Sequence, residues 1–283
     1  MPNIAIVAAL EREVSGLTKG CSRVEREYGG RKFVFFERHE MVVLCGGIGL
    51  EAARRAAEAV IALYRPTRIE SVGFAGALDG SLGSGDVFAP AVVIDARDGS
   101  RIQIEGENRQ GTLVTFMEVA GIDQKANLTQ AYGARAVDME ASAVAAAARA
   151  HGIPFGATKV ISDPLNFEMP GMARFIDPQG RFRTASFAVF AALRPWLWKR
   201  VARLASNSGK AARVLSEHLE RYRQELGQAS IQPAGKTPAA GRPTSPAAAT
   251  SGWRTGGHQC ECTRDSSCGG GCCSRSSWVW PCA

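Results

Sequence analysis

The feature that most limits the fold of this 283-residue chain is a set of short apolar segments separated by helical ones. The predicted strands are six or seven residues long, at 3–9, 41–46, 68–74 and 155–161, and 3–9 is a short apolar run. Continuous apolar runs of this length are typical of strands that are buried on both faces of a sheet. Ala-rich helical segments follow at 50–64 and 139–150. The alternation predicts an α/β domain in three layers, a twisted, mixed and largely parallel sheet flanked by helices.

The remaining segments complete this outline. Residues 33–37 pair with 41–46 around a polar turn, and Pro90 inside the run 87–94 favours an edge strand or a bulge. Further strands are predicted at 112–116 and 134–138, with a helix at 123–132 between them. A loop at 164–183 is followed by two helices, at 184–205 and 209–226.

Composition changes sharply near residue 227. Residues 1–226 have the composition of a folded domain, whereas 227–283 are rich in Pro, Gly, Ser and Cys without hydrophobic periodicity, which predicts disorder. Six of the eight cysteines lie in the last 24 residues, at spacings that fit no standard zinc pattern. The tail resembles an out-of-frame extension, and we expect no metal site in it.

Composition and charge exclude several classes of protein. No stretch of 18 apolar residues occurs, and the first 14 residues lack a basic n-region, so we expect a cytoplasmic protein without a signal peptide. The formal charge of +7 is confined to the C-terminal third, because residues 1–193 sum to −1. This distribution does not favour nucleic-acid binding.

Acidic residues follow several of the predicted strands. Glu11 and Glu13 come after the first strand, where a partly desolvated carboxylate can act as a general base or simply favour a helix dipole. Asp163 ends the strand at 155–161, where it can protonate a leaving group. Carboxyl ends of parallel strands meet at one edge of a sheet, which is where ligands bind.

Two further motifs lie at strand ends. In GFAGAL (73–78), small residues let a ligand approach the backbone or form a tight turn. In VDMEA (137–141), Glu140 can accept hydrogen bonds from a vicinal diol such as that of ribose, or the acid pair can cap the following helix.

Together, the motifs EREV, GFAGAL with GSGDV, VDMEASAV and VISD resemble the nucleoside phosphorylase family over residues 3–226. Within it, the chain is most similar to the bacterial methylthioadenosine/adenosylhomocysteine nucleosidases and to hopanoid-associated phosphorylase-like proteins. The resemblance implies the nucleoside phosphorylase fold and a purine nucleoside as ligand. It implies no metal or organic cofactor, and a homodimer in which a neighbouring subunit closes the pocket.

The resemblance also implies roles for individual residues. Asp163 matches the acid that protonates purine N7, and Glu13 matches the glutamate that orients the attacking water. Glu140 matches the carboxylate that holds the ribose hydroxyls, Met139 packs against the sugar, and Ile48 lies near the thioalkyl end. The substrate site is further predicted to include Ser162, Ala75 and Gly76.

These matches predict hydrolysis of the N-glycosidic bond of an adenine nucleoside, such as methylthioadenosine or adenosylhomocysteine, in methionine salvage. Phosphorolysis is the alternative, although the arginine loop of hexameric phosphorylases has no counterpart here. Phe74 stands where nucleosidases usually have Ser or Thr, and the segment between Ile94 and Thr112 is short. These departures leave open a non-catalytic nucleoside-binding relative, or an enzyme with a more open pocket for a bulkier 5′ substituent.

The helices after Thr184 resemble the hopanoid-associated branch, for which an adenosylated lipid is a candidate substrate. Residues 196–203 contain Trp196, Trp198, Lys199 and Arg200. These side chains can sit at a membrane surface. Alternatively, the tryptophans pack on the core and the charges face solvent.

Overall fold

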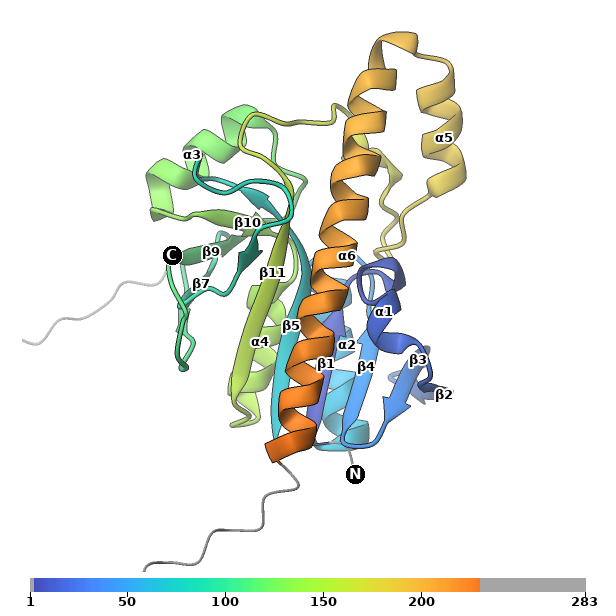
Figure 1. Ribbon diagram of the computed structural model, residues 1–283, viewed down its shortest axis with the longest axis vertical. Coiled ribbons are helices and arrows are strands. Elements are labelled where there is room, and N and C mark those ends of the chain that lie inside the picture. Colours follow the sequence, from blue (N-terminus) through green and yellow to red (C-terminus); the bar gives the residue numbers. More distant parts are fainter. Residues whose placement is uncertain (1–2, 230–283) are drawn as a thin grey trace, which may run out of the picture. The chain divides into compact units, whose positions relative to one another are not determined.

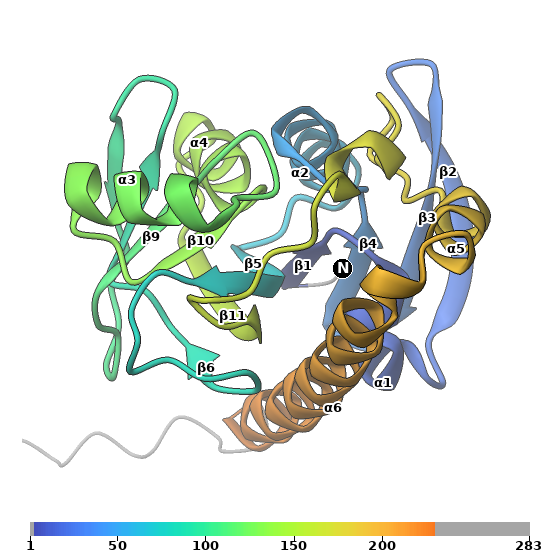
Figure 2. The same ribbon diagram turned by 90° about the horizontal axis from the view of Figure 1, so that it is seen from above.

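The computed structural model describes residues 3–229, and side chains through Arg221. Figures 1 and 2 show a twisted sheet with helices on both faces. The strands are β1 Ile4–Ala8, β2 Ser22–Tyr28, β3 Arg31–Arg38, β4 Met41–Cys45, β5 Arg68–Ala77, β6 Val87–Phe88, β7 Val92–Asp95, β8 Arg101–Gln103, β9 Thr112–Thr115, β10 Ala136–Asp138 and β11 Phe155–Asp163. The helices are α1 Ser15–Thr18, α2 Leu50–Tyr64, α3 Ile122–Tyr132, α4 Ala141–Ala150, α5 Thr184–Ala192 and α6 Trp198–Ala229, with short 3-10 turns η1 Glu11–Glu13, η2 Met172–Phe175 and η3 Pro195–Leu197.

The predicted fold class is confirmed. The sheet runs in the order β2-β3-β4-β1-β5-β10-β9-β7-β8, and β11 pairs with β5 and β6. Strands β4, β1, β5 and β11 are mutually parallel, whereas β2, β3 and β8 add antiparallel edges. The carboxyl ends of the parallel strands therefore meet at one edge of the sheet.

Strand β1 shows why the chain forms three layers. Its side chains alternate between two cores because successive residues of a strand point to opposite faces. Ala5 and Val7 pack with α2 and α4, whereas Ile6 and Ala8 pack with α6. Figure 2 shows α2 and α4 on one side of the sheet and α6 on the other. A strand buried on both faces needs the continuous apolar run found at 3–9.

Helix α6 differs from the prediction. We expected two helices separated near 206–208, but α6 continues through this segment and the break lies at Pro195, which opens η3. Proline lacks the backbone N–H that a helix interior needs. Gly209 costs only about 1 kcal/mol of helix propensity. That cost is offset because Ala211, Leu215 and Leu219, spaced four residues apart, pack against the sheet.

Three strand predictions were also incomplete. Strands β2 and β8 were missed because both are edge strands whose side chains are mostly exposed, so neither carries an apolar run. The run 87–94 splits at Pro90 into β6, which pairs with β11, and β7, which pairs with β8 and β9. Pro90 therefore ends one strand rather than forming a bulge within it.

Strand β11 contains an irregularity at its end. Ile161 pairs with Ala75 and Asp163 pairs with Gly76, so Ser162 is an extra residue relative to β5. Such a β-bulge re-aims the side chains that follow it. The tail predicted from residue 227 lies outside the described residues from 230 onward, and the domain boundary stays a prediction. Among residues 3–229, no helix is both long and apolar enough to cross a membrane.

We expect Leu215→Ala to lower the free energy of unfolding by about 2–5 kcal/mol, because this fully buried side chain joins α6 to the sheet. Leu193→Ala, the same substitution at a position that is 71% exposed, is the matched control and should change stability by less than about 0.5 kcal/mol. Chemical denaturation measures both. Equal effects would show that α6 does not pack on the sheet as described.

Candidate active site

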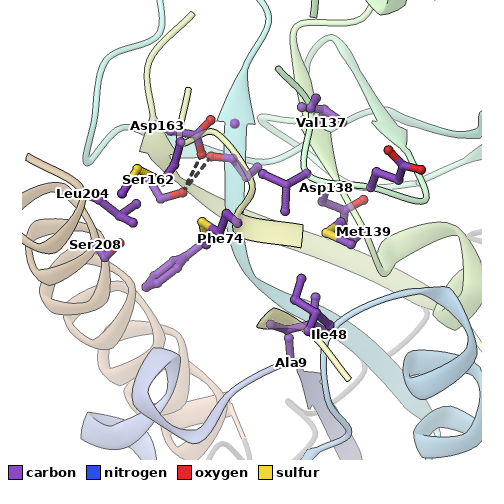
Figure 3. Close-up of a pocket in the computed structure, with 18 of the residues that line it drawn as sticks. Ala9, Ile48, Phe74, Val137, Asp138, Met139, Ser162, Asp163, Leu204 and Ser208 are labelled. Atoms are coloured by element: carbon purple, nitrogen blue, oxygen red, sulfur yellow. Dashed lines mark hydrogen bonds between the residues drawn. The ribbon is translucent and has the colours of Figure 1, made fainter. Parts of the chain in front are cut away.

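One pocket lies at the sheet edge where the parallel strands end. Every residue that the sequence predicted for the site lines it, namely Glu13, Ile48, Ala75, Gly76, Met139, Glu140, Ser162 and Asp163. They come from the ends of β1, β4, β5, β10 and β11. Figure 3 shows Asp163, Met139 and Ile48 around the same space. The structure therefore brings these residues together, while their roles stay predictions.

Asp163 is held by two side-chain donors. The hydroxyl of Ser162 donates to its Oδ1 at 2.9 Å, and the ammonium of Lys125 donates to its Oδ2 at 2.6 Å. Lys125 comes from α3 and is fully buried. Its ammonium also donates to the carbonyls of Pro164 (3.0 Å) and Phe167 (3.1 Å). Lys125 thus fixes both the carboxylate and the loop that follows β11.

Glu13 is a buried carboxyl group beside β5. It is 4% exposed, and the Leu10 amide donates to its Oε2 at 3.4 Å. Burial raises the pKa of Glu13 to about 7, although Lys159 opposes this shift. A carboxyl group with a pKa near neutrality is suited to accept a proton from a ligand.

Glu140 precedes α4 and faces the start of α2. Its Oε1 accepts a hydrogen bond from the Gly49 amide at 2.9 Å, and its Oε2 accepts one from the Met139 amide at 3.3 Å. Burial and the nearby charge of Asp138 raise the pKa of Glu140 to about 7. The capping interpretation of VDMEA applies to Asp138, whereas diol binding by Glu140 stays a prediction. Asp138 caps α4 by accepting from the Ala141 amide at 2.9 Å, and Glu140 lines the pocket.

A buried ion pair lies behind these acids. Lys159, on β11, is 1% exposed, and its Nζ lies 2.8 Å from Asp138 Oδ2 and 3.1 Å from Ser71 Oγ. Burial disfavours the charge of Lys159, but Asp138, Glu140 and Glu13 together outweigh burial and raise its pKa. One ammonium group thus faces three carboxyl groups.

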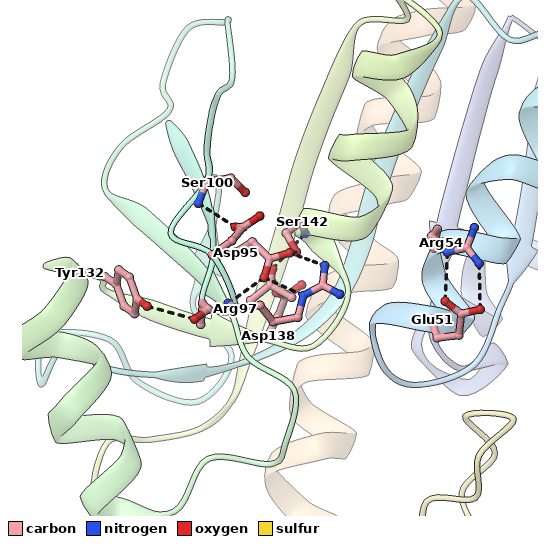
Figure 4. A network of polar contacts seen from close by, with 11 residues as sticks. Glu51, Arg54, Asp95, Arg97, Ser100, Tyr132, Asp138 and Ser142 are labelled. Atoms are coloured by element: carbon pink, nitrogen blue, oxygen red, sulfur yellow. Dashed lines mark hydrogen bonds and ion pairs between the residues drawn. The ribbon is translucent and has the colours of Figure 1, made fainter. Parts of the chain in front are cut away.

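Asp138 connects this ion pair to a second polar network (Figure 4). Thr115 donates to Asp138 Oδ1 at 2.7 Å and accepts from the Ser142 amide at 2.9 Å. The Ser142 hydroxyl donates to Asp95 at 3.0 Å, and Asp95 forms an ion pair with Arg97 at 2.7 Å. The network joins β7, β9, β10 and α4 beneath Met139 and Glu140.

The small residues of GFAGAL accommodate carboxyl groups. A Cβ atom at Gly76 would lie 2.6 Å from Asp163 Oδ2, and one at Gly73 would lie 2.9 Å from Glu13 Oε2. Gly73 also has φ +149°, which side chains other than glycine rarely adopt. Our interpretation of a tight turn was wrong, since β5 continues to Ala77. The two glycines make room for the two acids of the pocket.

The pocket becomes apolar toward α6. Phe74 reaches from β5 toward α6, where Leu204 and Ser208 line the pocket (Figure 3). Met172 and Ile176, from η2 and its flank, also line the pocket. Phe74 contributes no hydroxyl group to this wall, where Ser208 carries one. The arrangement can therefore hold a ligand with a polar centre and an apolar substituent.

Sequence reasoning missed the two buried lysines. A signal existed for Lys159, because a lysine inside the apolar strand FGATKVI must be paired when it is buried. Lys125 carries no such signal, since its partner is 38 residues away. Within residues 3–229, no cluster of His, Cys, Asp or Glu is arranged to hold a metal ion.

Fold and site together define an α/β protein with a nucleoside-phosphorylase-type sheet and acids at its strand ends. A family model described as the phosphorylase superfamily matches residues 3–120 and 115–194. The chain therefore belongs to the phosphorylase superfamily. A search of curated protein sequences found no match.

Solved structures share this fold at low identity. A mutant of Helicobacter pylori MTAN with 5′-methylthioadenosine in its active site is 19% identical, with a TM-score of 0.56 over 78% of this chain and 99% of that one. The native futalosine hydrolase of Helicobacter pylori is 18% identical, with a TM-score of 0.55 over 78% and 98%. The 5′-methylthioadenosine/S-adenosylhomocysteine nucleosidase of Neisseria meningitidis is 21% identical, with a TM-score of 0.53 over 77% and 100%.

We expect Glu13→Gln to stabilise the protein at pH 8 by about 1–3 kcal/mol, because the native carboxyl group is ionised there at a cost. Its pKa in the folded state is about 7 against 4.5 for the free group, so the native state holds the extra proton between these values. Stability is therefore lost as the pH rises through this window, and the variant escapes that loss. Denaturation at pH 8 and at pH 4.5 measures the difference.

The gain in stability of Glu13→Gln over the wild type should nearly vanish at pH 4.5. Glu105→Gln, at an exposed position, is the control and should show no such pH dependence. A pH-independent effect of Glu13→Gln would contradict the raised pKa.

Proposed function

We propose that this protein hydrolyses the N-glycosidic bond of a purine nucleoside and releases the free base, with methylthioadenosine and adenosylhomocysteine as candidate substrates. The observation that carries the proposal is that Asp163, Glu13 and Glu140 line one pocket. Structures that share its fold include a methylthioadenosine/adenosylhomocysteine nucleosidase and a futalosine hydrolase, which supports a hydrolase acting on nucleosides.

In this mechanism, Asp163 is the acid. As the bond between C1′ and N9 breaks, its electron pair passes to the purine, and Asp163 donates its proton to N7 so that the base leaves neutral. Asp163 ends the step as a carboxylate. The ammonium of Lys125 and the hydroxyl of Ser162, already 2.6 Å and 2.9 Å from its oxygens, stabilise that charge.

Glu13 is the base. It takes a proton from water as the water oxygen bonds to C1′, and the proton returns through solvent to Asp163 after the products leave. Glu140 accepts hydrogen bonds from the ribose hydroxyls, and Met139 packs against the sugar. Positive charge that develops on the sugar is stabilised by the carboxylates of Glu13 and Glu140.

Charge favours water over phosphate as the nucleophile. Among the residues that line the pocket, the cations are Arg12 and Lys125, and Lys125 is already bound to Asp163. A phosphate beside Glu13 would face a carboxylate, and Phe74 offers it no hydroxyl group. Like charges at short range disfavour the phosphate complex.

The apolar part of the pocket favours an uncharged 5′ substituent, such as that of methylthioadenosine, over the zwitterionic homocysteine group of adenosylhomocysteine. Met172, Ile176 and Leu204 offer no polar side chain to a ligand. A thioalkyl group or a longer apolar chain would bury its surface there and gain binding energy from the hydrophobic effect.

The decisive experiment measures release of the purine base from methylthioadenosine, adenosylhomocysteine and futalosine, with and without phosphate. We expect release without phosphate, and a loss of at least about 100-fold in Asp163→Asn, since positioned acids contribute 10²–10⁴-fold. Asp123→Asn, which changes an exposed acid, is the matched control and should retain activity. Strict dependence on phosphate would replace hydrolysis by phosphorolysis, and tight binding without turnover would indicate a nucleoside-binding relative.

We expect kcat/KM to fall at least tenfold per pH unit below about pH 7, because Glu13 and Glu140 must be ionised and the pKa of each is raised to about 7. A profile from pH 5 to pH 9 measures this, with circular dichroism at each pH to confirm that the protein stays folded. A flat profile between pH 5.5 and 8 would be inconsistent with either carboxylate acting in the ionised form.

A further inference from the structure

Helix α5 lies on the surface although seven of its nine residues are apolar. Its nine residues, TASFAVFAA, include no charged side chain, yet only Ala191 is buried. Phe187 and Phe190 are half-buried against Phe175. A helix that is apolar around its whole circumference is normally enclosed by protein or lipid. Within residues 3–221, no protein segment covers the outer face of α5.

Large exposed apolar side chains gather at the end of this helix. Four of the seven on the described surface lie here, namely Val189, Leu193, Trp196 and Trp198, with exposed fractions of 62%, 71%, 72% and 57%. The Trp198 indole N–H donates to the Ala191 carbonyl at 3.1 Å, so its polar atom is satisfied while much of its ring remains exposed. Contiguous exposed apolar surface marks an interaction site.

The charge of this region is of one sign. Residues 178–216 contain eight Lys and Arg and no Asp or Glu. Lys199 and Arg200 directly follow the tryptophans and are exposed. Arg200 lies 3.9 Å from Glu168, an acid outside this stretch. The Arg194 guanidinium stacks on the Phe190 ring at 3.9 Å. Figure 1 shows α5 beside the first turns of α6, at the end of the domain opposite the N-terminus.

We propose that this end of the domain docks on an anionic lipid bilayer. The docking surface consists of Val189, Leu193, Arg194, Trp196, Trp198, Lys199 and Arg200. Tryptophan and aliphatic side chains enter the boundary between headgroups and acyl chains, while adjacent cations bind acidic headgroups. The surface combines both groups on one short stretch of chain. Membrane contact of this kind lies in the plane of the interface and needs no spanning helix.

The charge pattern argues against other occupants. In a two-fold dimer the patch would meet its own copy, which would gather the cations of both copies in one interface to which residues 178–216 contribute no acid. Nucleic acid would satisfy the cations but would leave Val189 and Leu193 without a partner, because phosphates offer no apolar surface. A bilayer with acidic headgroups satisfies both kinds of side chain.

Docking would bring the pocket close to the bilayer. Leu204 and Ser208, which line the pocket, follow Trp198 on the same helix, and six residues of helix span about 9 Å. A nucleoside whose apolar 5′ substituent is partitioned into the membrane could then reach the pocket. The docking itself does not depend on the proposed function, because it requires no turnover.

Co-sedimentation of the full chain with vesicles tests the proposal. We expect binding to vesicles of phosphatidylcholine containing about a third phosphatidylglycerol, weak binding to phosphatidylcholine alone, and weakening when salt rises several-fold. Trp196→Ser/Trp198→Ser and Lys199→Gln/Arg200→Gln should each lower the partition coefficient at least tenfold. Lys19→Gln/Arg101→Gln, which removes two exposed cations elsewhere, is the matched control and should bind like the wild type.

Three outcomes would overturn the proposal. The first is no binding of the wild type to acidic vesicles. The second is unchanged binding of both the Trp196→Ser/Trp198→Ser and the Lys199→Gln/Arg200→Gln variants, here called the tip variants. The third is self-association or binding to RNA that the tip variants abolish while vesicle binding is absent. Thermal unfolding of each variant checks that the substitutions leave the fold intact. A blue shift of the tryptophan emission that is smaller in the tryptophan variant would place these two indoles at the bilayer.

Discussion

The polar network beside the pocket depends on one ammonium group buried in the sheet, that of Lys159. An unpaired charge with the 1% exposure of Lys159 would cost several kcal/mol, so Asp138 must lie within contact distance, as it does at 2.8 Å. Asp138 in turn binds Thr115 and the first amide of α4. Strands β9, β10, β11 and helix α4 are therefore joined at one point, and Glu140 at the start of α4 is positioned as a result.

The same ammonium group sets the acidity of the pocket. Burial drives the pKa of Glu13 and Glu140 upward, and Lys159 limits the rise to about 7 in both cases. Without a buried cation the two groups would stay protonated at neutral pH, and with a second cation they would be poor proton acceptors. A pocket that needs carboxyl groups with pKa values near 7 thus requires a buried cation such as Lys159 in the core beside it.

Local sequence signals predicted the fold class and the acids at the strand ends, because apolar runs report burial and acids after strands report the sheet edge. The resemblance to the nucleoside phosphorylase family completed the set of eight predicted site residues, which all line the pocket. The two lysines that hold the site were missed, although Lys159 carried a signal inside its apolar strand. Lys125 meets Asp163 across 38 residues, and no local pattern encodes that distance. The continuity of α6 was missed for the same reason, since the packing of Leu215 on the sheet outweighs the weak propensity around Gly209. Edge strand β2 lacks an apolar run altogether.

The extra residue in β11 lies between the regular part of the strand and its terminal acid. Because Ser162 interrupts the pairing with β5, Asp163 stands opposite Gly76 rather than one position further along. Loss of Ser162 would remove this irregularity together with the hydroxyl that donates to Asp163 Oδ1, while residues 155–161 kept their register with β5. A one-codon deletion would thus change how the terminal acid is held without changing the strand that carries it.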